Sequence, residues 1–133
     1  MPNFTGVVLS DPDLSHIKDK LINIASHFYQ KGWMVGTSGN LSVRVSPDTF
    51  LITASGRPKG QLAEDDLVVV RGLELPPFHS RDDLKPSAEV AIHQAVYSRV
   101  GEANAVFHVH SVESNVVSEW AVDDAVLLPP LEM

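Results

Sequence analysis

The stretch GTSGNLSVRVSPDTFLITASGRPKG, residues 36–60, decides the fold. Inside it Leu41, Val43 and Val45 alternate with polar residues, which is the pattern of a strand with one buried face. The letters SPDT then supply a turn, and an apolar run follows over residues 50–53. We therefore expect a β-hairpin that is bracketed by two loops of small residues.

An amphipathic helix is expected before the hairpin. In DLSHIKDKLINIASHFYQKG, residues 13–32, apolar side chains recur at helical spacing. Asp11 or Asp13 can cap the start of this helix, and Gly32 ends it. The side chains expected to face the core are Leu14, Ile17, Leu21, Ile24, Ala25 and Phe28.

Further strands and helices are expected after the hairpin. DLVVVRG (66–72) is typical of a third strand, whereas LELPPFHSRDDLKP (73–86) contains three prolines and is expected to be a loop. A second helix is expected from about Ser87 to Arg99. NAVFHVH (104–110) is expected to be a fourth strand and SVESNVVSEWAV (111–122) a third helix. This order predicts a layered α/β or α+β domain whose sheet is at least partly antiparallel.

The composition limits the possible classes of protein. The 133 residues are 44% hydrophobic and 20% charged, which is typical of one globular domain with a real core. No apolar run approaches the roughly 20 residues that cross a bilayer, and a net charge of -7 argues against a general nucleic-acid binder. We therefore expect neither a membrane nor a nucleic acid as partner. The absence of cysteine leaves only nitrogen and oxygen ligands for a metal and fits the cytoplasm.

A pair of histidines lies in the apolar run AVFHVHS, residues 105–111. On a strand, His108 and His110 share one face at roughly 7 Å, and their rings can turn onto one ion with bonds of about 2.0–2.1 Å. The alternative is a strand end at which two half-exposed histidines alternate with apolar residues. A catalytic zinc needs three protein ligands. The other candidates of suitable type are Glu89, His79 and His93.

Two loops of small polar residues flank the hairpin, GTSGNLS (36–42) and ITASGRPKG (52–60). Such loops can turn several backbone N–H groups and short side chains toward one phosphate. The alternative is two ordinary turns that close a hairpin. Their segment carries Arg44, Arg57 and Lys59 against one aspartate, a local excess of positive charge in an acidic protein. Both interpretations stay open on the residues alone.

The stretch KPSAEVAIH, residues 85–93, places Glu89 in the first turn of the expected second helix. An acidic residue there interacts favourably with the helix dipole. It can also serve as a general acid or base when a neighbouring metal tunes its pKa. His93 lies four residues on, shares the helix face of Glu89, and is expected to pack or hydrogen-bond there rather than bind metal.

The ordered set GTSGNLS, ITASG, KPSAE and AVFHVHS resembles the class II aldolase/adducin-head family. Within it, LKPSAE, HVHS and the terminal LEM are most similar to the methylthioribulose-1-phosphate dehydratases. The resemblance implies a three-layer αβα sandwich around a mixed, largely antiparallel sheet. It also implies one Zn²⁺ per subunit, a small phosphorylated ketose as substrate, and a homotetramer with active sites between subunits.

Site residues follow from the same resemblance, position by position. It implies that His108 and His110 bind the zinc and that Glu89 is the catalytic acid/base. Ala88 stands where the sugar-phosphate aldolases commonly have a second serine. The residues implied to hold the substrate and its phosphate are Thr37, Ser38, Gly39, Asn40, Ser55, Gly56 and Ser87.

The end of the chain leads to one more expectation. DDAVLLPPLEM (123–133) is apolar with no polar tail, and the third histidine ligand of the family falls beyond Met133. We therefore expect residues 1–133 to be a single class II aldolase/adducin-like domain that lacks its C-terminal part.

The implied activity is dehydration of 5-methylthioribulose 1-phosphate to the 2,3-diketo-5-methylthiopentyl 1-phosphate through an enediolate, with Glu89 moving the proton. Two alternatives stay open. One is a sugar-phosphate aldolase of the fuculose- or rhamnulose-phosphate type, which would share the intermediate. The other is a non-catalytic scaffold like the adducin head, if the short chain cannot hold the metal.

Overall fold

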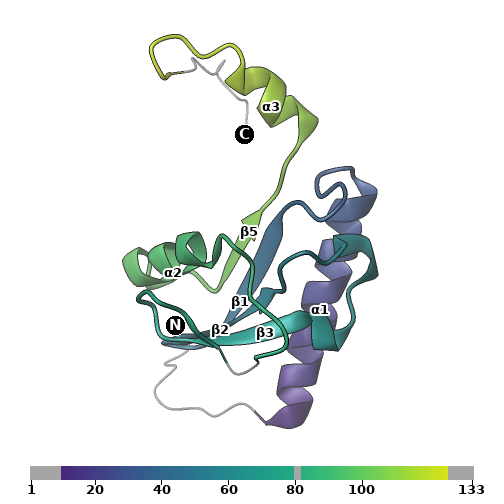
Figure 1. Cartoon of the computed structure of the whole chain (residues 1–133), viewed down its shortest axis with the longest axis vertical. Helices are drawn as coiled ribbons and strands as arrows, with labels where there is room; N and C mark the ends of the chain where they lie inside the picture. The colour runs from purple at the N-terminus through teal and green to yellow at the C-terminus, as the bar shows by residue number, and fades with distance from the viewer. Residues whose placement is uncertain (1–9, 80–81, 126–133) are drawn as a thin grey trace.

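The structure is a computed structural model that describes residues 10–79 and 82–125 (Figure 1). In chain order its elements are α1 Asp11–Gln30, β1 Asn40–Ser46, β2 Thr49–Thr53, the 3-10 turns η1 Lys59–Gln61 and η2 Glu64–Asp66, β3 Leu67–Arg71, β4 Phe78–His79, α2 Val90–Arg99, β5 Ala105–His108 and α3 Val112–Ser118. This is an α/β architecture, as the order of the sequence patterns predicts.

The sheet is built outward from the hairpin of β1 and β2. Its strand order is β4-β3-β2-β1-β5, and every pair among the described strands is antiparallel. Ser42 lies opposite Ile52 across the hairpin, and Asn40 lies opposite His108 on the outer strand β5. The predicted hairpin and third strand are confirmed. The sheet is antiparallel throughout the described pairs, rather than mixed.

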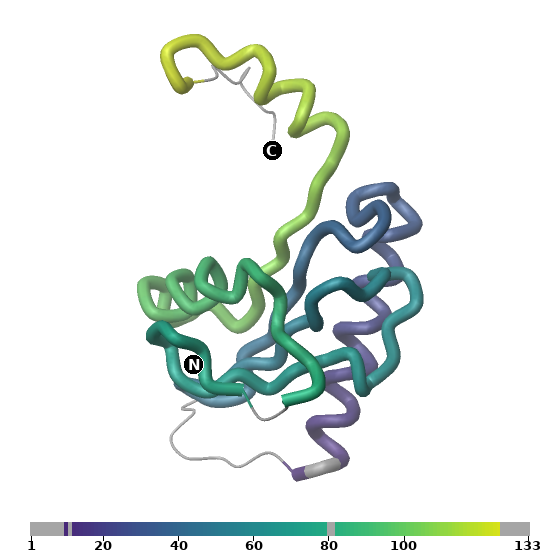
Figure 2. The backbone as a smooth tube through the Cα atoms, viewed as in Figure 1, coloured from purple at the N-terminus to yellow at the C-terminus, as the bar shows by residue number. Residues whose placement is uncertain are grey.

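Helices cover both faces of the sheet (Figures 1 and 2). On one face the fully buried Leu21 and Ala25 of α1 pack on Leu41 and Leu51, so the predicted apolar side of this helix is confirmed. On the other face β2 and β3 contribute a second cluster, which Val90 and Tyr97 of α2 cover. Successive residues of a strand point to opposite faces, so one hairpin serves both clusters.

The start of α1 differs from the prediction. Its N-cap is Ser10, whose side chain accepts a hydrogen bond from the backbone N–H of Asp13 at 3.4 Å and also bonds the Asp13 carboxylate. The helix therefore begins at Asp11 itself, with Pro12 in the first turn, where a missing N–H costs nothing. The predicted end is confirmed, because Gly32 follows the helix with φ +76°.

The second helix begins at Val90, three residues later than expected. Residues 85–87 are held in an extended conformation beside the end of β2. The Ser55 N–H donates to Lys85 O at 3.0 Å, and the Ser87 N–H donates to Thr53 O at 3.1 Å. Glu89 therefore occupies the N-cap position of α2 rather than its first turn.

Two other boundaries differ because of contacts outside the local sequence. The predicted loop 73–86 contains the short strand β4, which pairs with the end of β3. Strand β5 ends at His108, two residues earlier than expected, because β1 offers its last partner there at Asn40. His110 instead donates its backbone N–H to Trp33 O at 2.7 Å.

Helix α3 follows the histidines as predicted, but it covers only Val112–Ser118. Figure 1 shows it extending away from the sheet, and Val112, Val116 and Trp120 are exposed on and just after it. No helix in the described ranges is long and apolar enough to cross a membrane. The apolar ending at 127–131 lies outside the described residues.

Gly39 is required where the chain enters β1. Its φ is +77°, and a Cβ there would lie 2.6 Å from Met34 Cε and 2.9 Å from the carbonyl oxygen of His108. Gly72 has a similar φ of +84° but nothing within 4 Å of a Cβ. A comparison of substitutions at these two glycines therefore separates the cost of a left-handed backbone from the cost of a steric collision.

We predict that Gly39→Ala lowers the free energy of unfolding more than Gly72→Ala. Backbone strain costs each variant about 1–2 kcal/mol, and the collisions at Gly39 add about 1–3 kcal/mol. Urea denaturation of the two variants measures the difference. Equal losses would show that the loop relaxes freely around position 39.

Candidate functional site

Four chain segments, residues 37–40, 54–59, 87–89 and His110, meet at one end of the sheet and line a cavity of about 460 Å³. The hairpin is antiparallel, so the start of β1 and the end of β2 lie side by side. The extended residues 85–87 continue alongside the end of β2. The residues that line the cavity are Thr37, Ser38, Gly39, Asn40, Ala54, Ser55, Gly56, Lys59, Ser87, Ala88, Glu89 and His110.

The structure brings together all seven residues predicted to hold the substrate, and each of them lines the cavity. Glu89 and His110 line it as well. His108 is not in the lining, but it contacts Glu89 directly. The loops 37–40 and 54–56 therefore line the same open cavity, instead of being unrelated turns.

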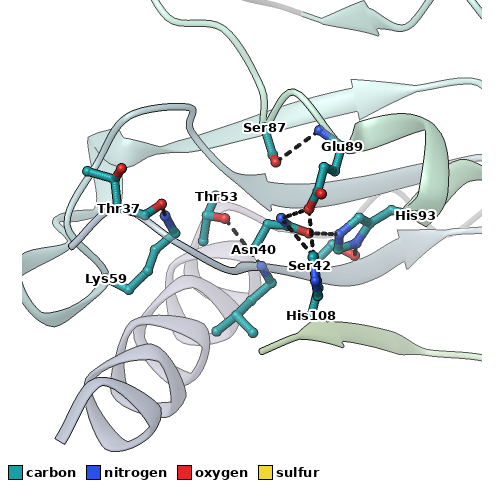
Figure 3. A network of polar contacts seen from close by, with 10 residues as sticks. Thr37, Asn40, Ser42, Thr53, Lys59, Ser87, Glu89, His93 and His108 are labelled. Atoms are coloured by element: carbon teal, nitrogen blue, oxygen red, sulfur yellow. Dashed lines mark hydrogen bonds and ion pairs between the residues drawn. The ribbon is translucent and has the colours of Figure 1, made fainter. Parts of the chain in front are cut away.

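Glu89 is held by two side chains from neighbouring strands (Figure 3). Its Oε2 accepts a hydrogen bond from Asn40 Nδ2 at 2.6 Å and lies 2.6 Å from His108 Nδ1. These two partners are adjacent because Asn40 and His108 lie directly opposite in the β1–β5 ladder. The hydrogen bond from Asn40, and then the hydrogen bond and charge of His108, lower the pKa of Glu89. The carboxylate is thus held in its basic form.

A chain of buried polar groups continues behind Asn40. Asn40 Oδ1 lies 2.5 Å from His93 Nε2, and His93 Nδ1 lies 2.6 Å from Ser42 Oγ. Ser42 Oγ is in turn 2.7 Å from the hydroxyl of Tyr97. Burial, followed by the charge of His108, lowers the pKa of His93 to about 4. A neutral His93 with its proton on Nε2 donates to Asn40, which leaves Nδ2 of the amide directed at Glu89.

The expectation for His93 is therefore confirmed, since both its ring nitrogens are used in hydrogen bonds inside the core. The sequence pattern could not reveal the partners. Ser42 and Asn40 lie on one face of β1, and Tyr97 lies one turn beyond His93 on α2. Only the packing of α2 on the sheet brings them into one chain of hydrogen bonds.

The rings of His108 and His110 lie next to each other, with centroids 4.6 Å apart and planes tilted by 36°. Since Nδ1 of His108 is engaged by Glu89, its Nε2 remains available. Two imidazole nitrogens, one of them oriented by a carboxylate, suit a zinc ion chemically. Across residues 10–79 and 82–125, however, no group of three histidines, cysteines or acids is arranged to hold a metal.

His79, which the sequence offers as a candidate metal ligand by residue type, lies too far from His108 to share a metal ion with it. His79 lies on β4, at the edge of the sheet opposite to β5, so three strands separate it from His108. Its Nδ1 is buried without a partner among the described residues.

Three lining residues, Ala54, Ala88 and Lys59, were not predicted individually as site residues, although Ala54 and Lys59 lie in the loop 52–60. Lys59 is only 2% exposed. Its sequence signal was weak, because a lysine in a positively charged loop is most simply interpreted as a solvated charge.

The comparisons with known proteins agree with this architecture. Residues 19–131 match the family described as the Class II Aldolase and Adducin N-terminal domain. The chain belongs to this family.

Particular relatives share much of the sequence. The chain is 49% identical over 125 residues to a methylthioribulose-1-phosphate dehydratase from Microcystis aeruginosa, covering 94% of this chain and 58% of that protein. It is 37% identical to a methylthioribulose-1-phosphate dehydratase from Leptospira biflexa, covering 91% of this chain and 61% of that protein. The chain thus spans about three-fifths of the length of these relatives.

Among solved structures, the fold is similar to that of L-fuculose-1-phosphate aldolase from Thermus thermophilus, with a TM-score of 0.68 and 30% identity. The match covers 80% of this chain and 51% of that protein.

We predict that acid weakens the fold through His93. Between its folded pKa of about 4 and the ordinary value of 6.5, the unfolded chain binds a proton at this position and the folded chain does not. The free energy of unfolding therefore rises with pH across this window, and its loss on acidification reaches about 3 kcal/mol.

The comparison of His93→Gln with His16→Gln tests this assignment. Urea midpoints measured from pH 4 to pH 7 should depend less on pH in His93→Gln, while the exposed His16 on α1 should leave the wild-type slope. An unchanged slope in His93→Gln would mean that other groups cause the acid sensitivity.

Proposed function

We propose that this protein dehydrates 5-methylthioribulose 1-phosphate to 2,3-diketo-5-methylthiopentyl 1-phosphate. The observation that supports it most is the position of the Glu89 side chain, which Asn40 and His108 hold at the wall of a cavity lined by small polar loops. The relatives at 37–49% identity named above carry the same activity in their names.

In this proposal the phosphate of the substrate binds between the two loops. Their backbone N–H groups and hydroxyls are donors that suit a phosphate. The assigned residues are Thr37, Ser38, Gly39, Asn40, Ser55, Gly56 and Ser87. Anchoring the phosphate there would hold the carbon chain of the sugar beside the carboxylate of Glu89. The reacting carbon would then be oriented for proton transfer before the reaction begins.

Zinc is part of the proposal, with the rings of His108 and His110 as its ligands from the described residues. The ion would supply positive charge that acidifies the hydrogen next to the substrate carbonyl. His108 would contribute Nε2, because Glu89 holds its Nδ1. The carboxylate of Glu89 would then have two roles, because it orients the ring of His108 and also faces the substrate.

Glu89 would move the proton in both halves of the reaction. Among the described residues only its Oε2 has a hydrogen-bond partner, so Oε1 is available to the substrate. The carboxylate takes the proton from C3, and the electron pair of that bond forms a carbon–carbon double bond as the C4–O bond breaks. Returning the proton to the departing hydroxyl releases water, and the enol product rearranges to the diketone.

We also propose that residues 1–133 form one domain, with helical layers on both faces of a largely antiparallel sheet. In this proposal the protein assembles as a homotetramer in the cytoplasm.

An aldolase is the second candidate activity, favoured by the structural similarity to L-fuculose-1-phosphate aldolase. An aldolase would break the C3–C4 bond and release an aldehyde.

We predict that zinc-loaded protein converts 5-methylthioribulose 1-phosphate to a product lighter by one water, and that Glu89→Gln lowers the turnover about 10²–10⁴-fold. Mass spectrometry of the reaction mixture measures both. Glu102→Gln, at an exposed glutamate after α2, should retain the wild-type rate. Release of an aldehyde fragment would favour the aldolase, and full activity of Glu89→Gln would contradict the role of this carboxylate.

We further predict that His108→Ala and His110→Ala each weaken zinc binding at least about tenfold. Zinc content per chain after dialysis without chelator measures the effect. His16→Ala removes an exposed histidine on α1 and serves as the control. Zinc content that is unchanged in both site variants would place the metal elsewhere.

A further inference from the structure

Lys59 is a buried cation at the wall of the cavity. It is the first residue of η1, is 2% exposed, and lines the same cavity as Glu89 and His110. Its ammonium group donates to the backbone oxygen of Thr37 at 2.9 Å (Figure 3). It also donates to the backbone oxygen of Arg57 at 2.9 Å. No carboxylate of the described residues lies within 4.0 Å of it.

The two carbonyl groups belong to the two different loops that line the cavity. Thr37 precedes β1, and Arg57 follows β2. The ammonium therefore joins these loops and fixes their spacing. An ammonium group has three N–H donors, and two are used here, so one donor remains.

The backbone next to Lys59 packs against helix α1. The ring of Tyr29 packs directly on the backbone of Gly60, where a Cβ would collide with it. The neighbouring cation Arg57 is already paired, with its Nε 3.4 Å from Asp66 Oδ1. The side chain of Lys59 thus stays in a water-poor position although its charge has no anionic partner in the described chain, which is costly.

We propose that Lys59 is the counter-ion of the doubly charged phosphate group of the substrate, to which it gives its third N–H while its other two hold the loops together. This inference rests on the proposed function, since it assigns the charge partner within the same anion site. A phosphate monoester would supply the opposite charge that the described residues lack, and charge-assisted hydrogen bonds are the strong ones.

Acid–base linkage gives this role a distinct signature. Burial lowers the pKa of Lys59. A bound dianion favours the protonated form, so it must raise that pKa, and anion affinity must fall as pH rises through it. The other titratable groups nearby are Tyr29 on α1, Glu89 and His110 across the cavity, and Arg57, which stays charged.

The test uses inorganic sulfate, which keeps its double charge across the whole pH range studied. Calorimetric titration of the chain with sulfate gives the affinity of wild type, Lys59→Met and the control Lys20→Met. Lys20 is an exposed lysine on α1, so its variant has the same net charge. We expect Lys59→Met to bind sulfate at least about tenfold more weakly and Lys20→Met to bind it as wild type does.

A second measurement needs no variant and is independent of whether Lys59→Met folds. In wild-type protein with ¹³C-labelled lysine, NMR follows the ε-carbon of Lys59 against pH, with and without sulfate. We expect sulfate to raise the pKa of Lys59. A structural clamp alone would leave that pKa unchanged, and this result, or equal sulfate affinity in folded Lys59→Met, would overturn the inference.

The outcomes separate this inference from the proposed function. Sulfate binding that does not depend on Lys59 overturns the role of the lysine and leaves the dehydratase proposal standing. Sulfate binding that depends on Lys59, in a protein without dehydratase activity, supports the anion site and contradicts the proposed reaction. Wild-type protein that binds no sulfate would contradict both.

Discussion

The side-chain amide of Asn40 is the contact on which both the core and the cavity depend. One end donates to Glu89 and the other accepts from His93, so a single buried group connects the carboxylate with the polar chain beneath α2. An amide has one donor end and one acceptor end. If it turned over, its oxygen would face the carboxylate of Glu89, acceptor against acceptor. The protonation state of His93 and the orientation of Glu89 are therefore coupled.

This coupling is possible because backbone pairing brings the partners together. The β1–β5 register sets Asn40 opposite His108, and the extended residues before α2 bring Glu89 to the same end of the sheet. The hairpin delivers its two loops to that end without any crossover. Two lining positions, Gly39 and Gly56, have φ values of +77° and +72° that favour glycine. A side chain at Gly39 would also meet Met34 and the backbone of β5. The relative positions of the site side chains are therefore set by the rigid strands rather than by the loops.

The sequence predicted what local periodicity can determine. The hairpin, the core face of α1 and the histidine pair all follow from spacing along a few residues. The family resemblance named the cavity loops. The late start of α2, the early end of β5 and the role of Lys59 all depend on contacts between distant segments, such as Ser87 with Thr53 or Lys59 with Thr37. A buried lysine is indistinguishable from a surface lysine until the fold encloses it.

The far end of the hairpin has a different character. The turn at Pro47 and Asp48 joins β1 to β2 at the end opposite the cavity, and the seven residues of β1 separate the two by roughly 20 Å. The turn is held by the Gly72 N–H, which donates to Asp48 O, and by Arg44 Nη1, which donates to Pro47 O at 2.9 Å. The carboxylate of Asp48 accepts from the hydroxyls of Ser46 and Thr49. The cavity residues thus lie at one end of the hairpin, and the turn at residues 47–48 lies at the other. A label or a short insertion at this turn would lie far from the cavity and would leave the residues that line it in place.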